Sequence, residues 1–223
     1  MNYLQLCKAV RQECGIQGSG PAAVTNQTGL LKRVVEWVQD ADNIIQTLYP
    51  DWNFLWSEFT EDTVEGSADV TKPDDFGQWD VESFGVDRGT DSGRSLEVSD
   101  YKDWRKNFSA KTNQPPSRIT ILPDQNLRLY APADGIYEIY ANYWKTPILL
   151  TEDTDLPPYP ARFHRAIVAR AKMLWFEDQE AWDNYKLAEV EFNQWMVELT
   201  GFALPGQQES NKGQPAPMTV RPE

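Results

Sequence analysis

The sequence is poor in the side chains that most metal and catalytic sites use. Its 223 residues include one histidine, His164, and two cysteines. A single imidazole excludes metal sites with several histidine ligands and leaves any catalytic triad one candidate base. His164 stands at a predicted helix start beside Arg162 and Arg165. We therefore interpret it as a structural residue.

The two cysteines, Cys7 and Cys14, do not make a disulfide or a metal site. On one helix, two turns would separate them by about 10 Å along the axis, which is too far for a disulfide. The same spacing makes them, with His164, a poor zinc set. We interpret both as small core hydrophobes in a protein of a reducing compartment. We expect no metal and no cofactor.

Long apolar runs are also missing. No run approaches the roughly 18 residues that a membrane-spanning helix needs. The first residues, "MNYLQLCKAVRQEC", are amphipathic and lack the apolar core and cleavage site of a secretory signal. We expect the chain to stay in the cytoplasm of the cell that makes it, without membrane contact.

Catalytic motifs are equally scarce. The glycine-containing stretch "GIQGSG" follows a predicted helix and lacks the Lys-Ser/Thr of a phosphate-binding loop. Neighbouring carboxylates, such as Glu61 with Asp62 or Asp74 with Asp75, could serve a glycosidase in principle. Carboxylates this abundant also become neighbours by chance. We predict that the protein is not an enzyme and keep a hydrolase as the third hypothesis.

Positive charge is in short supply. The net charge is −13, and residues 60–103 hold thirteen Asp/Glu against four Lys/Arg. This balance argues against binding nucleic acid through its phosphates. The ordinary interpretation of the acidic stretch is a solvated face. A more specific hypothesis is a surface that lets DNA pass without gripping it.

The sequence has ample material for a folded core, because hydrophobic residues make up 40% and aromatic residues 12% of it. Apolar residues at helical spacing predict helices over 2–13 and 28–48 and two more helices between Phe163 and Gly201. Residues 202–223 contain four prolines and no periodicity, so they are predicted to be an extended tail.

The middle of the chain has strand patterns. Alternating Trp52, Phe54 and Trp56 predict a strand directly after Pro50. Short strands are predicted in "WDVESFGV" and "RSLEV", followed by a helical turn or two with Ser99 as N-cap. The segments "RITIL", "NLRLY" and "IYEIYANYW" predict a three-strand antiparallel meander, with the last strand central in its sheet.

These elements predict an α+β protein. The amphipathic stripes at both ends of the chain must be buried, and one helical bundle made from both ends is the simplest solution. We therefore predict a helical bundle from residues 1–50 and 155–201, a β-rich insertion over 51–154 and an extended C-terminal tail over 202–223.

Several segments, taken in order, are similar to one known family. They are the opening "MNYLQL", the loop "GIQGSGP…VTNQTG", the run "RVVEWVQDADNIIQ" leading into "WNFLW", and "DLPPYPARFHRAIVARA". With them the chain resembles the head-to-tail adaptor (connector) proteins of tailed bacteriophages, the type that binds beneath the portal.

The resemblance implies a structural virion protein with a helical bundle and a β insertion. In the family, twelve copies join the portal ring as a collar that extends the DNA channel and receives the tail. The implied partners are the portal protein, a downstream tail or nozzle protein and further copies of the chain. DNA would pass through without specific binding. The implied location is the head-tail junction of the virion, after assembly in the bacterial cytoplasm.

The resemblance also suggests two candidate regions. C-terminal segments of the family reach along the portal, which points to Phe202, Leu204, Pro205, Pro215, Pro217, Met218 and Val220. The acidic stretch would face the channel or neighbouring subunits through Glu61, Asp62, Glu65, Asp74, Asp75, Asp80 and Glu82. The alternative is a β-rich tail component that binds carbohydrate or the host surface, with exposed tryptophans stacking on sugar rings.

Overall fold

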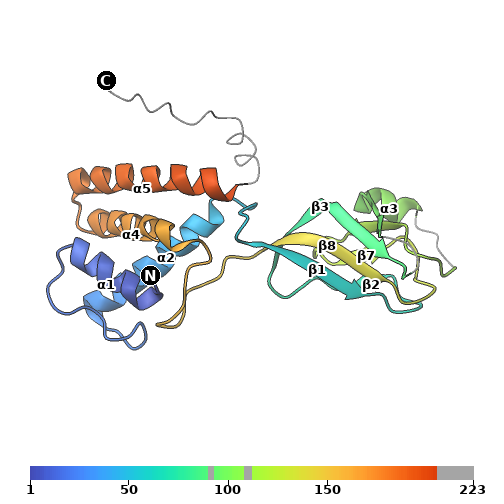
Figure 1. The fold of residues 1–223 in the computed structure, drawn as a ribbon, viewed down its shortest axis with the longest axis horizontal. Coiled ribbons are helices and arrows are strands. Elements are labelled where there is room, and N and C mark those ends of the chain that lie inside the picture. Colours follow the sequence, from blue (N-terminus) through green and yellow to red (C-terminus); the bar gives the residue numbers. More distant parts are fainter. Residues whose placement is uncertain (90–92, 108–111, 205–223) are drawn as a thin grey trace, which may run out of the picture. The chain divides into compact units, whose positions relative to one another are not determined.

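A computed structural model describes residues 1–89, 93–107 and 112–204 of the chain (Figure 1). These residues form five α-helices, a short 3-10 helix and eight strands in two sheets, so the predicted α+β class is confirmed. Their contacts divide the chain into two compact units. We call Met1–Leu55 with the described residues from Pro147 onward the helical unit, and the described residues of Trp56–Thr146 the β unit.

The helical unit combines elements from both ends of the chain: α1 (Tyr3–Glu13), α2 (Gly29–Thr47), η1 (Ala161–Phe163), α4 (Arg165–Asp178) and α5 (Trp182–Ala203). Helix α4 contacts α1, α2 and α5 and is buried on several sides. Alanines at 166, 169 and 171 are among its buried residues, and such small side chains let neighbouring helices approach closely. The two chain ends therefore share one apolar interior.

Helix α2 buries apolar residues at the helical spacing that predicted it. Val34, Val38 and Ile45 are buried, whereas Leu48 at the helix end is 47% exposed. Two polar residues, Asp42 and Gln46, are buried instead. Polar side chains can be buried when they are hydrogen-bonded, and these two bond to each other.

The aromatic stretch after Pro50 does not form the predicted strand. The strand β1 (Trp56–Asp62) begins four residues later than expected. Trp52 is fully buried in the helical unit, where its indole nitrogen donates a hydrogen bond to the Ile45 carbonyl oxygen at 3.1 Å. Its ring stacks on Phe54 at 5.1 Å between centroids. The alternation in the sequence therefore reflects packing against helices.

The β unit contains two four-stranded sheets. One has the order β1-β8-β3-β4 and the other β2-β7-β6-β5. The remaining bounds are β2 (Asp69–Val70), β3 (Phe76–Asp87), β4 (Arg94–Ser95), β5 (Glu97–Ser99), α3 (Tyr101–Asn107), β6 (Arg118–Ile121), β7 (Leu127–Leu129) and β8 (Glu138–Lys145). Buried Phe59, Trp79, Phe84, Ile119 and Ile139 lie in its core.

The predicted meander is wrong in its third strand. Strands β6 and β7 pair antiparallel as expected, but β8 belongs to the other sheet. There it lies between β1 and β3 and pairs with β1 from Trp144↔Trp56 to Glu138↔Asp62. Its position is central, as predicted from its apolar residues on both faces.

Two helix ends also differ from prediction. Ser99 lies in β5 and pairs with Thr120, and the side chain of Asp100 accepts the backbone hydrogen bond of Lys102 at 2.7 Å in the first turn of α3. Helix α5 continues two residues past the predicted stop at Gly201, because glycine permits a helix end without requiring one. Among the helices described, none is both long and apolar enough to cross a membrane.

Candidate assembly surfaces

The predicted acidic residues all lie in the β unit, at different places on it. Five of them are exposed: Glu61 and Asp62 at the end of β1, Glu65 in the following turn, Asp74 before β3 and Glu82 in β3. Asp75 and Asp80 are half-buried.

Two shallow hollows bring some of these residues together. Glu61, Asp62 and Glu138 line one hollow of about 290 Å³, together with Thr60. Glu61 and Asp74 line a second hollow of about 490 Å³. Glu138 was not among the predicted residues, and it pairs in register with Asp62 across β8 and β1. Its position among apolar residues of a strand was the available signal.

Asp75 is not a free surface charge. Its carboxylate accepts a hydrogen bond from the Tyr143 hydroxyl at 2.8 Å and forms an ion pair with Lys145 at 2.9 Å. Partial desolvation raises the pKa of Asp75, but the hydrogen bonds from Lys145 and Tyr143 outweigh it and hold the pKa below its usual value. A lowered pKa is unsuited to a general acid, so Asp75 serves better as a link between the start of β3 and β8.

The sparse histidine and cysteines occupy structural positions. Burial raises the pKa of both Cys7 and Cys14 to about 12, and neither is in a disulfide. The buried His164 has Nε2 3.0 Å from the Tyr159 carbonyl oxygen. Because a carbonyl only accepts, Nε2 carries the proton. Over the described part of the chain, no three His, Cys, Asp or Glu residues are placed to hold a metal ion.

Two residues of the predicted portal-binding region belong to the end of the helical unit. Phe202 lies in α5, and Leu204 is the first residue after this helix. The Phe202 ring packs 5.4 Å from the ring of Phe163, and the Arg162 guanidinium lies 4.5 Å from both ring centroids. The other predicted residues, Pro205, Pro215, Pro217, Met218 and Val220, lie outside the described residues.

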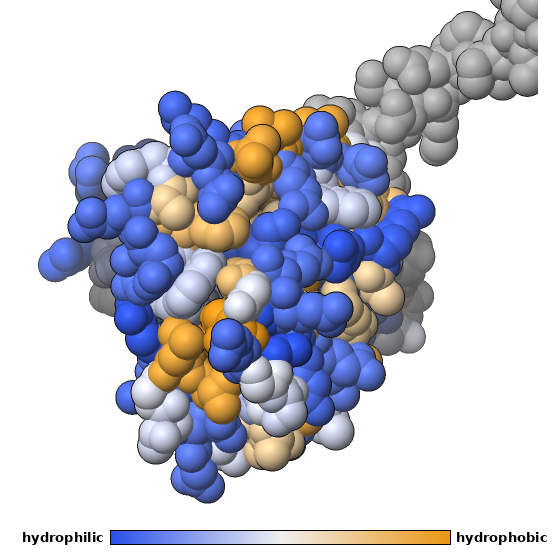
Figure 2. Space-filling view, turned by 90° about the vertical axis from the view of Figure 1, so that its left-hand side faces the viewer, coloured by the Kyte–Doolittle hydropathy of each residue, from blue (hydrophilic) through white to orange (hydrophobic). Residues whose placement is uncertain are grey.

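Helix α5 has apolar residues on two faces. Ala188, Met196 and Leu199 are buried, and the helix packs against α4. A second row, which we call the outer stripe, consists of Leu187, Val190 and Val197, exposed by 72%, 56% and 73%. Figure 2 views the helical unit and shows apolar side chains at its top, where α5 lies. Apolar side chains exposed along one face of a helix can take part in a protein contact site.

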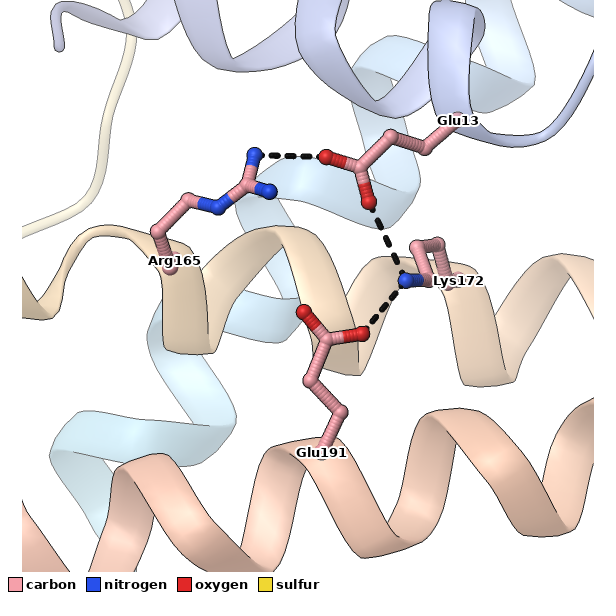
Figure 3. A network of polar contacts seen from close by, with 4 residues as sticks. All are labelled: Glu13, Arg165, Lys172 and Glu191. Carbon is pink, nitrogen blue, oxygen red and sulfur yellow. Dashed lines mark hydrogen bonds and ion pairs between the residues drawn. The ribbon is translucent and has the colours of Figure 1, made fainter.

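A charged network joins three helices of the same unit (Figure 3). The Glu13 carboxylate of α1 accepts from Arg165 at 2.5 Å and from Lys172 at 3.0 Å, both on α4. Lys172 also donates to Glu191 of α5 at 2.6 Å. The Lys172 side chain is only 14% exposed, so its charge depends on both carboxylates.

The β unit offers little exposed tryptophan for sugar stacking. Trp79 and Trp104 are buried, and Trp56 is 43% exposed. Sugar-binding modules commonly present aromatic rings to solvent as platforms. Trp56 is thus the observation that favours the carbohydrate alternative, and it stands at the start of β1.

Comparison with known proteins assigns the chain to a family. Among curated proteins, none matches the chain. The model of one family, described as SU10 adaptor protein, matches residues 1–221 and so includes both units. The predicted resemblance to phage head-tail adaptors is confirmed at this level. The chain belongs to the SU10 adaptor protein family and is a structural adaptor protein of a bacteriophage.

Proposed function

We propose that this adaptor forms a ring of twelve copies beneath the portal, extends the DNA channel and provides the attachment site for the tail. The observation that carries the proposal is the family match over residues 1–221. A match of this extent includes the helical unit, the β unit and most of the C-terminal segment. The proposed partners are the portal protein, a downstream tail or nozzle protein and further copies of the chain.

In this proposal the helical unit is a bundle that forms the collar, and the β unit is an insertion into it. A ring requires heterologous contacts, in which one face of each subunit meets a different face of the next. The outer stripe of α5 supports contact with another chain, because Leu187, Val190 and Val197 expose apolar surface to solvent. The isolated protein is expected to be monomeric and to close its ring on the portal.

The acidic residues of the β unit are proposed to face the channel or the neighbouring subunit. A negative lumen repels the phosphate backbone, so DNA slides without binding. The exposure of Glu61, Asp62 and Asp74 supports this role, whereas the ion-paired Asp75 contributes less charge. A ring reconstruction with these carboxylates on the outer rim would refute the assignment.

The region from Phe202 to the C-terminus is proposed to bind the portal. A proline-rich extended segment can wrap a large partner surface and become ordered on binding. Assembly would take place in the host bacterial cytoplasm and end at the head-tail junction of the virion. A catalytic role is not part of the proposal.

Co-sedimentation with the cognate portal ring tests the proposed function. The full chain should sediment with the portal, and a variant lacking residues 205–223 should remain in the supernatant. Glycan-array binding that disappears in Trp56→Ala would instead favour the carbohydrate alternative. Light scattering of a stable free dodecamer would contradict the expectation of a monomer.

A further inference from the structure

A groove lies at the C-terminal end of α5, where the described chain ends. It has a volume of about 410 Å³ and is lined by Arg162, Phe163, Val197, Glu198, Gly201 and Phe202. Phe163 is buried, whereas Phe202 is 39% and Val197 73% exposed. The groove therefore presents apolar side chains to solvent, with one cation and one anion beside them.

The chemistry of this groove suits a proline-rich segment. Aromatic-lined grooves bind polyproline II segments, whose extended backbone carries little conformational entropy to lose. Here Arg162 lies over both phenylalanine rings at 4.5 Å and holds them in place. Gly201 adds no side chain, so a bound backbone can approach the helix closely.

The chain itself supplies such a segment. Residues 215–220 read "PAPMTV", and "RPE" follows. Between Leu204 and this segment are ten residues, "PGQQESNKGQ". For a random-coil chain of ten residues, the root-mean-square end-to-end distance is about 17 Å. Since Phe202 lines the groove, the segment can return to it at an effective concentration in the millimolar range.

Charge also matches. The groove carries Arg162 and Glu198, and the segment is followed by Arg221 and Glu223. Each charge of the groove therefore has an opposite partner within three residues of Val220. We propose that this groove binds residues 215–220 of its own chain in the free protein.

This contact goes beyond the proposed function and does not depend on it. The contact would also regulate binding of the tail to the portal. If the portal takes up the same segment, it must compete with the groove, so the tail stays on its subunit until a portal is present. A competing internal site lowers apparent affinity by the fraction of free tail.

A double cysteine variant tests the contact in the full chain without any portal. In Val197→Cys with Met218→Cys, oxidation should give a disulfide within one chain. The matched control is Val190→Cys with Met218→Cys, since Val190 is also exposed and lies two helical turns away on the same stripe. We expect cross-linking at least tenfold faster at position 197 than at 190. The raised pKa of the native Cys7 and Cys14 keeps them slow to react.

The other outcomes overturn the proposal. Equal rates at the two positions would mean that the tail has no preferred place on α5. Cross-linked dimers in place of monomers would assign the groove to the tail of another copy. An excess of a synthetic peptide of residues 213–223 provides a second measurement. It should lower the yield of the intramolecular disulfide at position 197, and an unchanged yield would contradict specific binding in the groove.

Discussion

The hydroxyl of Tyr159 donates a hydrogen bond to the carboxylate of Asp42 at 2.7 Å, across 117 residues of sequence. Both side chains are buried in the helical unit. The amide nitrogen of Gln46 donates to the same carboxylate at 2.8 Å, and the Gln46 side chain also pairs with both backbone groups of Ile148. One buried carboxylate thus connects α2 with the chain that returns from the β unit.

This carboxylate should make stability depend on pH. Burial raises the pKa of Asp42 from 3.8 to about 6, against the hydrogen bonds from Tyr159 and Gln46 that lower it. The protonated Asp42 carboxyl therefore contributes to folding stability. This contribution is fully present below about pH 4 and is lost as the pH rises through about 6. Between these limits, the unfolding free energy of the wild type should fall by up to about 3 kcal/mol relative to Asp42→Asn.

Comparing the wild type with Asp42→Asn removes the pH dependence that other titrating groups contribute to the unfolding free energy. The lowered pKa of His164, caused mainly by burial, acts in the opposite direction in both proteins and cancels in the difference. Urea denaturation of both proteins from pH 4 to pH 7, monitored by circular dichroism, measures this difference in unfolding free energy. Parallel stability curves would show that Asp42 does not titrate as described.

The network around Lys172 should contribute measurably to the helical unit. Lys172→Met leaves Glu191 without its cation and removes one of the two partners of Glu13. We expect a loss of about 1 to 2 kcal/mol in unfolding free energy. The control is Lys32→Met, because the Lys32–Glu36 pair on α2 is exposed by 61% and 51% and should contribute less than about 0.5 kcal/mol. Equal effects of the two changes would rule out a special role for the network.

The ring of Tyr140 on the neighbouring strand leaves no room for a side chain at position 85, so this position requires glycine. Gly85 pairs in register with Tyr140, and a Cβ atom at Gly85 would overlap the Tyr140 ring. Gly85→Ala should therefore destabilise the β unit by about 1 to 3 kcal/mol. Gly135→Ala is the control, since its Cβ would meet Tyr137 at an ordinary 3.7 Å. Thermal unfolding of both variants tests this, and a Gly85→Ala midpoint equal to that of wild type would contradict it.

The helices were more predictable than the sheets for a physical reason. Helical periodicity is local, so α1 and α2 lie within one residue of their predicted bounds. Strand pairing is not local. The residues of β8 indicate a central strand, but its own sequence does not reveal that its partner is β1, which ends at Asp62 and pairs there with Glu138.

The structural surroundings of the candidate residues were predictable only in part. The acidic residues stand out in the composition, but the pairing of Asp75 with Lys145 depends on the fold. The buried Asp42 and Gln46 were missed, because a polar residue in a helix is expected to face solvent unless its partners are known. The outer stripe of α5 was not predicted, because helical spacing alone does not separate an exposed apolar face from a buried one.

Removal of the tail should separate folding from assembly. A chain lacking residues 205–223 keeps every described element, so its circular dichroism and melting temperature should match those of the full chain within about 2 °C. Its portal binding, measured by surface plasmon resonance, should fall at least a hundredfold. Unchanged binding would move the portal contact to another surface, and a collapsed melting temperature would assign the tail to the fold.

Electron microscopy of the adaptor mixed with its cognate portal tests the central claim most directly. We predict a collar of adaptor copies coaxial with the portal, one for each portal subunit, with the channel continuing through it. Portal rings that remain bare at saturating adaptor, or adaptor bound only at the outer rim, would contradict the proposed function.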